Sequence, residues 1–454
     1  MALPDLSTGH SEPCSAALKT LIERGYVNQG TDLPGVDAAF EAGIVPAYAG
    51  FDATADSLHV GHLLLIMALR HLQQTGHKPI VLIGGGTTRI GDPSFRSEAR
   101  PMLTDERIAA NIEGIRKVFD RLLVFGEGPT DAVMVNNADW LDSIRWIDML
   151  RDVGRHFSVN RMLSFDSVKS RLEKQENLSF LEFNYMILQA FDFLELSRRT
   201  GCRLQMGGAD QWGNIINGID LIRRTDGKEV FGVTTPLLTT SSGVKMGKTA
   251  AGAVWLNEDR LSPYDYWQFW RNTEDADVVR FLKLFTDLPM DEIERFGQAE
   301  GTELNAVKER LANEATALAH GTNAAKQAEA TASQAFGQGE AAEGLPTLHL
   351  NDAEGLAGVA LVDLLVRAGL TSSKGEARRA ISGRGVRING NVVEVDTMIS
   401  SQDLPIRLSL GRKRHTVVKS GFSKCCRRNS ARLADIADIR VEFPEECRET
   451  FLRG

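Results

Sequence analysis

The amino-acid sequence predicts an α/β fold in which helices cover a parallel β-sheet, followed by a helical segment and a small α+β module. Over the first half of the chain, short apolar runs alternate with helical patterns, whereas the pattern is mainly helical from residue 262 to residue 320. Two short helical patterns and two strand-like runs then occupy residues 361–393. Because 454 residues exceed what one hydrophobic core usually organises, we expect two or three domains.

The elements of the first domain follow in a regular order. Residues 61–76 have a helical pattern, and KPIVLIGGG at residues 78–86 is an apolar run that ends in glycines. An amphipathic helix over residues 107–123 and a strand-like run at residues 132–141 continue the alternation. Residues 178–196 predict a long buried helix. This order predicts a parallel sheet that binds ligands at the carboxyl ends of its strands.

The remaining elements define a second and a third domain. SPYDYWQFWRN at residues 262–272 begins with a Ser cap and Pro, which are helix start signals, and the pattern stays mainly helical to His320. The next segment is rich in Ala, Gln, Glu and Gly and is predicted to be a linker rather than a packed helix. NGN between the last strand-like runs is a tight-turn signal. The predicted boundaries are residues 1–260 for the α/β domain, 261–323 for the helical domain, 324–346 for the linker, 347–419 for the α+β domain and 420–454 for a tail without an assigned role.

Composition and charge narrow the class of protein. With 43% hydrophobic and 25% charged residues the chain is typical of globular proteins, and the N-terminal residues lack signal-peptide and transit-peptide patterns, so a cytoplasmic protein is expected. The five cysteines show no metal-ligand spacing. The net charge is −8, yet residues 359–419 carry eleven Lys and Arg against five Asp and Glu, a balance of +6. Such a basic module suggests a nucleic-acid partner, although charge alone favours a solvated charged surface.

FDATADSLHVGHLLLIMAL at residues 51–69 places two histidines where a helix should begin. His59 and His62 are three positions apart and share one face of the first turn. A helix N-terminus already offers unpaired N–H groups, so two added donors indicate a site for polyphosphate, and Gly61 would let a flat ring or phosphate approach the backbone. A metal pair or two incidental helix histidines are the alternatives.

SSGVKMGKTAAG at residues 241–252 has two lysines three positions apart between glycines. A loop of this kind can swing in and place the ammonium groups of Lys245 and Lys248 on a transferring phosphate. An exposed lysine-bearing loop would explain either lysine alone. Together, the two motifs resemble HIGH and KMSKS, the signatures of class I aminoacyl-tRNA synthetases.

The resemblance becomes narrower when further motifs are included. AYAGFDATADSLHVGHL, IGDPS, YMILQAFDF, MGGADQWGNI and KMGKT occur in the order and approximate spacing of bacterial tyrosyl-tRNA synthetases, to about Lys419. This resemblance implies a Rossmann-like catalytic domain, a helical anticodon-binding domain and an S4-like RNA-binding domain. It also implies tyrosine–tRNA ligase activity: L-tyrosine and ATP form tyrosyl-adenylate and pyrophosphate, and the tyrosine then passes to the 3′ end of tRNA(Tyr).

The family pattern also implies roles for single residues. Tyr48 and Asp192 would hold the substrate phenol, since an ionised carboxylate only accepts hydrogen bonds and would be left unpaired by phenylalanine. Asp92, Tyr185 and Gln189 would surround the α-ammonium group, with Gln205 nearby. The implied ATP-binding residues are Gly50, Asp52, Gly61, Gly208, Asp210 and Gln211. The implied catalytic residues, which form a phosphate cradle, are Thr54, His59, His62, Lys245, Lys248 and Thr249.

The expected cofactors and partners follow from the same resemblance. Mg²⁺ should accompany ATP, but we recognise no dedicated protein ligands for it and no tightly bound cofactor. A homodimer is implied, and no membrane partner is expected. Two residues depart from the family pattern: Phe95 replaces the glycine after GDPS, and Arg89 occupies a usually apolar position. Both concern the geometry of the loop at the ATP site.

Three other classes of protein share part of these features. A tryptophanyl-tRNA synthetase shares the fold and both motifs, but Asp192 would then face an indole with no matching acidic group. A small-molecule adenylyltransferase also uses the two-histidine motif, but gives the basic module no purpose. A non-catalytic RNA-binding or splicing protein could keep the fold, although the intact His59, His62, Lys245 and Lys248 argue against it.

Overall fold

The structure, a computed structural model, falls into two compact units that are described separately. The first unit extends to Gly337, and the second begins at Leu345. The described residues are 12–92, 102–243, 246, 248–249, 252–337, 345–411 and 414–420. None of the helices in these ranges combines the length and apolar character needed to cross a bilayer.

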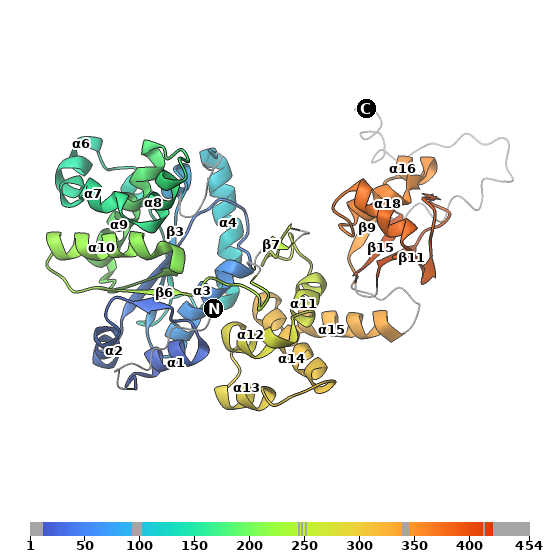
Figure 1. Ribbon diagram of the computed structural model, residues 1–454, viewed down its shortest axis with the longest axis horizontal. Helices are drawn as coiled ribbons and strands as arrows, with labels where there is room; N and C mark the ends of the chain where they lie inside the picture. Colours follow the sequence, from blue (N-terminus) through green and yellow to red (C-terminus); the bar gives the residue numbers. More distant parts are fainter. Residues whose placement is uncertain are drawn as a thin grey trace, which may run out of the picture. The chain divides into compact units, whose positions relative to one another are not determined.

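The described part of the first unit contains the predicted parallel sheet (Figure 1). β1 is antiparallel to β6, and the other neighbouring strands are parallel. The predicted strands at residues 78–86 and 132–141 are confirmed as β3 and β4, each shorter than its apolar run. In spatial order the strands are β1 (Gln29–Gly30), β6 (Phe231–Thr235), β5 (Leu204–Gly208), β2 (Pro46–Phe51), β3 (Lys78–Ile83) and β4 (Val133–Asn136).

Helices cover both faces of this sheet. On one face, Tyr48 and Leu82 pack with Phe193 of α9 and Leu221 of α10, and on the other β2 and β3 contact α3. The predicted long buried helix is confirmed as α9, which starts at a capping box between Ser179 and Glu182. The main helices are α1 (Ala16–Arg24), α2 (Leu33–Ala42), α3 (Val60–Gln74), α4 (Asp105–Leu122), α9 (Phe180–Thr200) and α10 (Trp212–Thr225).

Short helices fill the segment between β4 and α9. The Arg171 guanidinium and the Glu182 carboxylate form an ion pair of 2.9 Å with both side chains 4% exposed, which ties α8 to the start of α9. Further single turns follow β3 and β5 at η1 (Thr87–Arg89) and η4 (Ala209–Gln211). The short helices between β4 and α9 are α5 (Ala138–Leu141), α6 (Trp146–Asp148), η2 (Met149–Val153), η3 (Gly154–His156), α7 (Val159–Leu163) and α8 (Asp166–Glu173).

The rest of the first unit is helical, as predicted. Its first helix starts where expected, because the Ser262 side chain accepts from the backbone N–H of Asp265 and Pro263 occupies the first turn. Trp270 lies at the centre of an aromatic core with Phe281 and Phe285. The helices are α11 (Pro263–Arg271), η5 (Asp275–Asp277), α12 (Val278–Phe285), α13 (Met290–Phe296), α14 (Glu303–His320) and α15 (Thr322–Gly337).

The predicted linker over residues 324–346 is wrong for its first part, which belongs to α15. Ala325, Ala328 and Ala332 are buried, and the helix packs against α11 and α14. Small side chains let helix backbones approach closely, so a segment without large apolar residues can still pack well. Residues 338–344 of the predicted linker lie outside the described residues.

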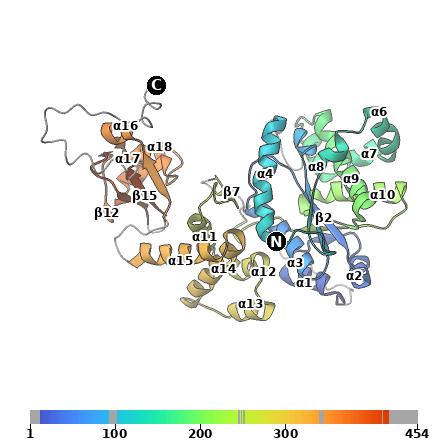
Figure 2. The same cartoon turned by 180° about the vertical axis from the view of Figure 1, so that it is seen from behind.

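The second unit is the predicted small α+β module (Figure 2). The two helices predicted from the sequence are confirmed as α17 and α18, which pack on a sheet of order β12-β11-β14-β15-β9. Asn389 and Gly390 adopt positive φ values of 48° and 87°, which confirms the tight turn at NGN. The predicted tail lies outside the described residues except for Ser420. The elements are β9 (Thr347–Leu350), α16 (Asp352–Ala357), β10 (Val359–Ala360), α17 (Leu361–Arg367), α18 (Lys374–Ser382), β11 (Val386–Ile388), β12 (Asn391–Val392), β13 (Met398–Ile399), β14 (Ile406–Leu410) and β15 (Arg414–Ser420).

Candidate active site

The predicted binding residues gather where the strand order of the sheet reverses. β2 and β5 are neighbours, and the chain continues from β2 to β3 on one side and from β5 to β6 on the other. Ligands of open parallel sheets bind outside the carboxyl ends of strands at this reversal. Gly50 and Asp52 lie at the end of β2, and Gly208 and Asp210 at the end of β5. Gly208 lies close to Asp210, since a Cβ at this glycine would be 2.5 Å from Oδ1 of that side chain.

The two histidines cap the helix that they begin. His59 is the N-cap of α3, and its Nδ1 accepts from the backbone N–H of Gly61 over 3.0 Å. Nδ1 of His62 accepts from the backbone N–H of His59 over 3.2 Å, and the two ring centroids are 4.0 Å apart. A neutral imidazole whose Nδ1 accepts carries its proton on Nε2. Both rings can therefore donate from Nε2, as a polyphosphate site requires.

Gly61 lies directly against the ring of the capping His59. A Cβ at this position would lie 2.8 Å from Cε1 of His59, so the ring that approaches the backbone is the capping imidazole itself. The same Cβ would lie 3.8 Å from the carbonyl oxygen of Met246 in the lysine loop, residues 241–252. The absence of a side chain thus allows the His59 cap to form.

Backbone hydrogen bonds join the residues directly after the lysine loop to the start of α3. The N–H of Val60 donates to the carbonyl of Val254 over 2.9 Å, and the N–H of Leu256 donates to that of Leu58 over 2.9 Å. β7 (Lys248–Thr249) pairs with β8 (Gly252–Ala253) in the loop itself. Lys245 lies outside the described residues, and so does Phe95. The two-histidine motif and the lysine motif are about 185 residues apart in the sequence, but they are neighbours in the fold.

Asp192 lies buried at the end of the site predicted to hold the phenol. Its Oδ1 accepts from the indole N–H of Trp140 over 2.7 Å, and its Oδ2 accepts from the side-chain amide of Asn137 over 2.9 Å. Burial raises the pKa of the Asp192 carboxyl to about 7, although both hydrogen bonds lower it. The carboxylate is therefore held in place, and it keeps acceptor lone pairs for a further donor.

Tyr48 supplies a second polar group at this end. Its side chain is 1% exposed, and its hydroxyl has no hydrogen-bond partner among the residues that the structure describes. Burial, and after it the charge of Asp192, raises the pKa of Tyr48 well above its ordinary value. Since buried polar groups are nearly always hydrogen-bonded, the orphan hydroxyl indicates a missing polar partner. Gln205 pairs with Tyr48 across β2 and β5, and its buried Oε1 also has no partner.

Asn137 and Trp140 were not predicted from the sequence, and neither was the Thr87 hydroxyl that joins them to the ATP end of the site. The amide of Asn137 donates to Asp192 and to Thr87, and the Thr87 hydroxyl donates to Asp52 over 2.9 Å. Trp140 is the second missed residue. The signal for Asn137 and Trp140 was their place directly after β4, at the same edge of the sheet as the other binding residues.

The predicted α-ammonium residues form one single hydrogen bond and one connected chain of hydrogen bonds. The Tyr185 hydroxyl donates to Oδ2 of Asp52 over 3.1 Å, and Asp92 accepts from the Gln211 amide over 2.8 Å. Gln189 accepts from Asn214, which also bonds Gln211; the distances are 2.9 and 3.0 Å. The structure thus joins residues predicted for tyrosine to residues predicted for ATP, which places the two sets side by side.

The remaining predicted positions lie at the rim. Thr54 is exposed in the loop between β2 and α3. Two hydrogen bonds at Ala53 fix this loop: its N–H donates to the Thr88 hydroxyl, and its carbonyl accepts from the Asn111 side chain. Arg89, one of the departures, donates to the carboxylates of Asp105 and Asp142 over 2.9 and 2.6 Å. Its charge is paired on the surface.

Comparison with known proteins decides the family. The family model of class I tRNA synthetases (W and Y) matches residues 43–337, and the S4 domain model matches residues 361–404. A tyrosine–tRNA ligase of Zymomonas mobilis is 60% identical over 405 residues, which cover 89% of this chain and 98% of that protein. The chain belongs to the tyrosyl-tRNA synthetases. A tyrosine–tRNA ligase of Dinoroseobacter shibae is 58% identical and is covered to 99%, with 90% of this chain aligned.

Solved tyrosyl-tRNA synthetases share the fold of the first unit. The C-terminally truncated mitochondrial tyrosyl-tRNA synthetase of Aspergillus nidulans has a TM-score of 0.65 and 31% identity, and the match covers 70% of this chain and 94% of that chain. The predicted Rossmann-like fold with a C-terminal S4 domain is therefore confirmed. Membership of the tyrosyl-tRNA synthetases also rules out the tryptophan, adenylyltransferase and non-catalytic alternatives.

Proposed function

We propose that the site residues carry out the tyrosine–tRNA ligase reaction, in which L-tyrosine is activated with ATP and transferred to the 3′ end of tRNA(Tyr), in the roles given below. The orphan Tyr48 hydroxyl next to the fixed Asp192 carboxylate is the observation that carries the choice of substrate. A phenol O–H entering between them donates to Asp192 and accepts from Tyr48. Phenylalanine would leave the Tyr48 hydroxyl buried and unpaired, which costs roughly 1–3 kcal/mol, and it would offer no donor to the remaining lone pairs of Asp192.

In the activation step, the carboxylate of tyrosine attacks the α-phosphate of ATP and pyrophosphate leaves. No protein nucleophile is needed, so catalysis rests on positioning and on stabilising negative charge. His59 and His62 donate from Nε2 to the phosphates, and Lys245 and Lys248 add positive charge as pyrophosphate departs. Thr54 and Thr249 complete this cradle.

The other side chains orient the two substrates. Asp92, Tyr185 and Gln189 bind the α-ammonium group, with Gln205 behind them. Asp210 accepts from the ribose hydroxyls, and Gln211 lies beside it. Gly50, Asp52, Gly61 and Gly208 line the path of ATP, and Asp52 also fixes Tyr185 through the hydrogen bond described above.

Mg²⁺ is proposed to arrive on the phosphates of ATP. In the part of the chain that the structure describes, no three His, Cys, Asp or Glu side chains gather as a metal site. We therefore assign it no protein ligand. When bound, Mg²⁺ would neutralise phosphate charge, and the residues named above do the positioning.

A homodimer is also proposed, and an apolar surface supports it. Trp146, Ile147 and Phe180 are 55%, 67% and 70% exposed, and the Trp146 and Phe180 rings lie 6.3 Å apart. Exposed apolar groups that gather in this way mark protein interfaces. Ile147→Glu with Phe180→Glu should produce a monomer in light scattering, whereas Val395→Glu, at another exposed apolar residue, should not. A dimer that persists in the double variant would exclude this surface.

The direct test of the proposed function is amino-acid-dependent ATP–pyrophosphate exchange with all twenty amino acids, followed by tRNA charging. L-Tyrosine should support exchange, and phenylalanine and tryptophan should barely do so. Equal exchange with tryptophan would refute the assignment of Tyr48 and Asp192. Cell fractionation would test the expected cytoplasmic location.

A further inference from the structure

The chain enters the lysine loop directly beside the start of α12 in the helical domain. The backbone N–H of Ser241 donates to Oδ2 of Asp277 over 2.8 Å, and the Ser241 hydroxyl donates to Glu274 over 2.9 Å. Nη1 of Arg280 donates to the carbonyl oxygen of Thr239 over 3.0 Å. Side chains of the helical domain therefore hold the entrance of the lysine loop.

The Asp277 carboxylate binds the lysine loop instead of its own helix. Asp277 is the N-cap residue of α12, where an aspartate side chain ordinarily accepts from an N–H of the first turn. It makes no such bond to α12, whose residues are all described; the side chain is 3% exposed and its Oδ1 lies 3.9 Å from Nη1 of Arg280. A carboxylate that accepts from a backbone N–H makes a strong, charge-assisted hydrogen bond. The bond to Ser241 is thus both buried at its acceptor and specific to the loop.

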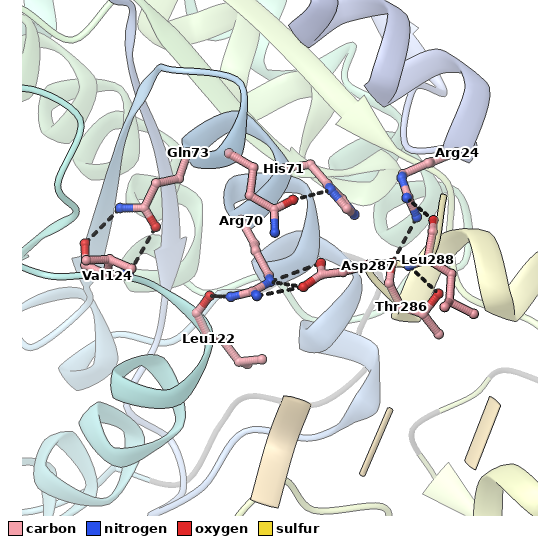
Figure 3. A network of polar contacts seen from close by, with 10 residues as sticks. Arg24, Arg70, His71, Gln73, Leu122, Val124, Thr286, Asp287 and Leu288 are labelled. Carbon is pink, nitrogen blue, oxygen red and sulfur yellow. Dashed lines mark hydrogen bonds and ion pairs between the residues drawn. The ribbon is translucent and has the colours of Figure 1, made fainter. Parts of the chain in front are cut away.

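The helix α12 is itself fixed at its other end (Figure 3). Nη2 of Arg70, on α3, donates to Oδ2 of Asp287 in the corner that follows α12, over 2.6 Å. Arg24 donates over 2.9 and 2.6 Å to the carbonyl oxygens of Thr286 and Leu288 in the same corner. The eight residues of α12 span about 12 Å. A short helix with its far end bound to the α/β body therefore carries the groups that hold the loop.

The exit of the lysine loop is fixed as well. The hydrogen bond between Val60 and Val254, described above, joins the residues after the loop to the start of α3. The entrance is bound to α12, and the Arg70 contact joins α12 to the same α3. Lys245 is only four residues from Ser241 in the sequence, so a fixed entrance restricts the positions that this lysine can take.

We propose that Asp277, with Arg280 and Glu274, is a positioning residue for tyrosine activation: it sets the place of the lysine loop relative to the phosphates of ATP. This inference rests on the proposed role of Lys245 and Lys248 as charges that stabilise the departing pyrophosphate. Such stabilisation is largest when the charges are in place before the reaction, because reorganisation then costs little. A held entrance lowers that cost by restricting the conformations of the loop. Formation of tyrosyl-adenylate therefore depends on the helical domain.

The test compares Asp277→Ala with the parent in stopped-flow measurements of tyrosyl-adenylate formation by the full chain, with each rate normalised to the titrated number of active sites. Loss of the acceptor for Ser241 should lower the maximal rate about tenfold or more, since the charges are no longer held in place. The dissociation constant of tyrosine should stay within about twofold of the parent. Asp277→Asn keeps an oxygen that can accept from the same N–H, so it should recover most of the lost rate.

A double-mutant cycle shows whether Asp277 acts through the lysines. The second background is a chain with Lys245→Ala and Lys248→Ala, which should be slow by itself. In that background Asp277→Ala should change the rate by less than about twofold, because the charges that it positions are gone. A residue that only stabilises the fold would lower the rate by the same factor in both backgrounds.

Asp275→Ala is the matched control. Asp275 lies in η5, directly before α12, and pairs with Lys308 of α14 inside the helical domain. Its removal should leave the rate and the tyrosine affinity unchanged. If Asp277→Ala folds poorly, Arg280→Met removes the donor to Thr239 from a side chain that is 38% exposed, and it should still slow activation.

Each other outcome overturns the inference. An unchanged rate in folded Asp277→Ala or Arg280→Met would show that the contacts at the entrance do not position the loop. Equal factors in the two backgrounds of the cycle, or a rate that falls only together with tyrosine affinity, would show a general effect on the fold. If the lysine variant by itself keeps the parental rate, the proposed role of the lysines fails. That result differs from one in which the lysines matter and Asp277 does not.

Discussion

Trp140 donates its indole N–H to Oδ1 of Asp192 over 2.7 Å, and both side chains are buried. This hydrogen bond stabilises the ionised carboxylate against the burial that raises its pKa to about 7. In its proposed role, Asp192 accepts a hydrogen bond from the substrate phenol, and that role requires the ionised form. The proposal therefore gives Trp140 an influence on the pH range in which tyrosine binds.

Trp140→Phe should move the pH dependence of tyrosine binding upward. Loss of the indole donor removes a contribution that lowers the pKa of Asp192, so the carboxyl takes up its proton at a higher pH. Equilibrium binding of L-tyrosine, measured between pH 6 and 9, should show its midpoint above that of the parent. Trp146→Phe, in an exposed tryptophan on α6, should leave the midpoint unchanged. A downward shift for Trp140→Phe would contradict this role.

Asp192→Asn should change how stability depends on pH. The folded-state pKa of Asp192 lies above the value of about 3.9 for an unfolded chain, so the folded state binds more protons between these two values. The resulting stabilisation is fully present below about pH 4 and is lost as the pH rises through about 7. Relative to Asp192→Asn, the parent should therefore lose free energy of unfolding from pH 5 to pH 7.5. Urea denaturation at both pH values measures this, and parallel changes in the two proteins would disprove it.

Arg171→Met should destabilise the protein by about 3–5 kcal/mol, because it leaves the Glu182 carboxylate buried and unpaired. The pair ties α8 to the helix that carries Tyr185, Gln189 and Asp192. Lys169→Met removes a charge from the same helix, but the Lys169–Glu173 pair is exposed, and the expected change is below about 1 kcal/mol. Urea denaturation measures both changes. Equal destabilisation by the two variants would show that the buried pair contributes no more to stability than the exposed pair.

Lys248→Ala should act mainly on the activation rate. Positive charge is needed most as pyrophosphate departs, so adenylate formation should slow by a factor on the order of a hundred or more while tyrosine affinity changes little. Stopped-flow kinetics separate the two quantities. If tyrosine affinity falls strongly while the rate of adenylate formation stays unchanged, the lysine loop has a binding role instead.

Removal of everything after residue 342 should separate activation from charging. The predicted activation motifs all precede Gly252, whereas the +6 segment at residues 359–419 lies in the second unit. The truncated protein should still form tyrosyl-adenylate, but it should bind tRNA more weakly and with a shallower salt dependence, because fewer phosphate contacts release counterions. Pyrophosphate exchange and charging at two salt concentrations check this. Undiminished charging would show that the basic segment is only a solvated surface.

The sequence by itself determined the features that depend on neighbours along the chain. The Ser262 cap, the turn at Asn389–Gly390 and the strand that precedes the glycines at residues 84–86 each follow from short-range rules of conformation. The alternation of strands and helices then requires a parallel sheet, and the carboxyl ends of its strands must meet at one edge. The location of the site, with His59 at a helix start, could be predicted for this reason.

Only the tertiary structure decided which side chains meet. Tyr185 contacts Asp52 over 133 positions of sequence, Asn137 and Trp140 contact Asp192 over more than fifty, and Arg70 contacts Asp287 over 217. The sequence gives no local signal for such pairs, because a hydrogen bond depends on distances of about 3 Å that packing alone sets. The same limit explains α15: its alanines are weakly apolar one by one, and they form a packed helix because α11 and α14 present a surface that small side chains can approach closely.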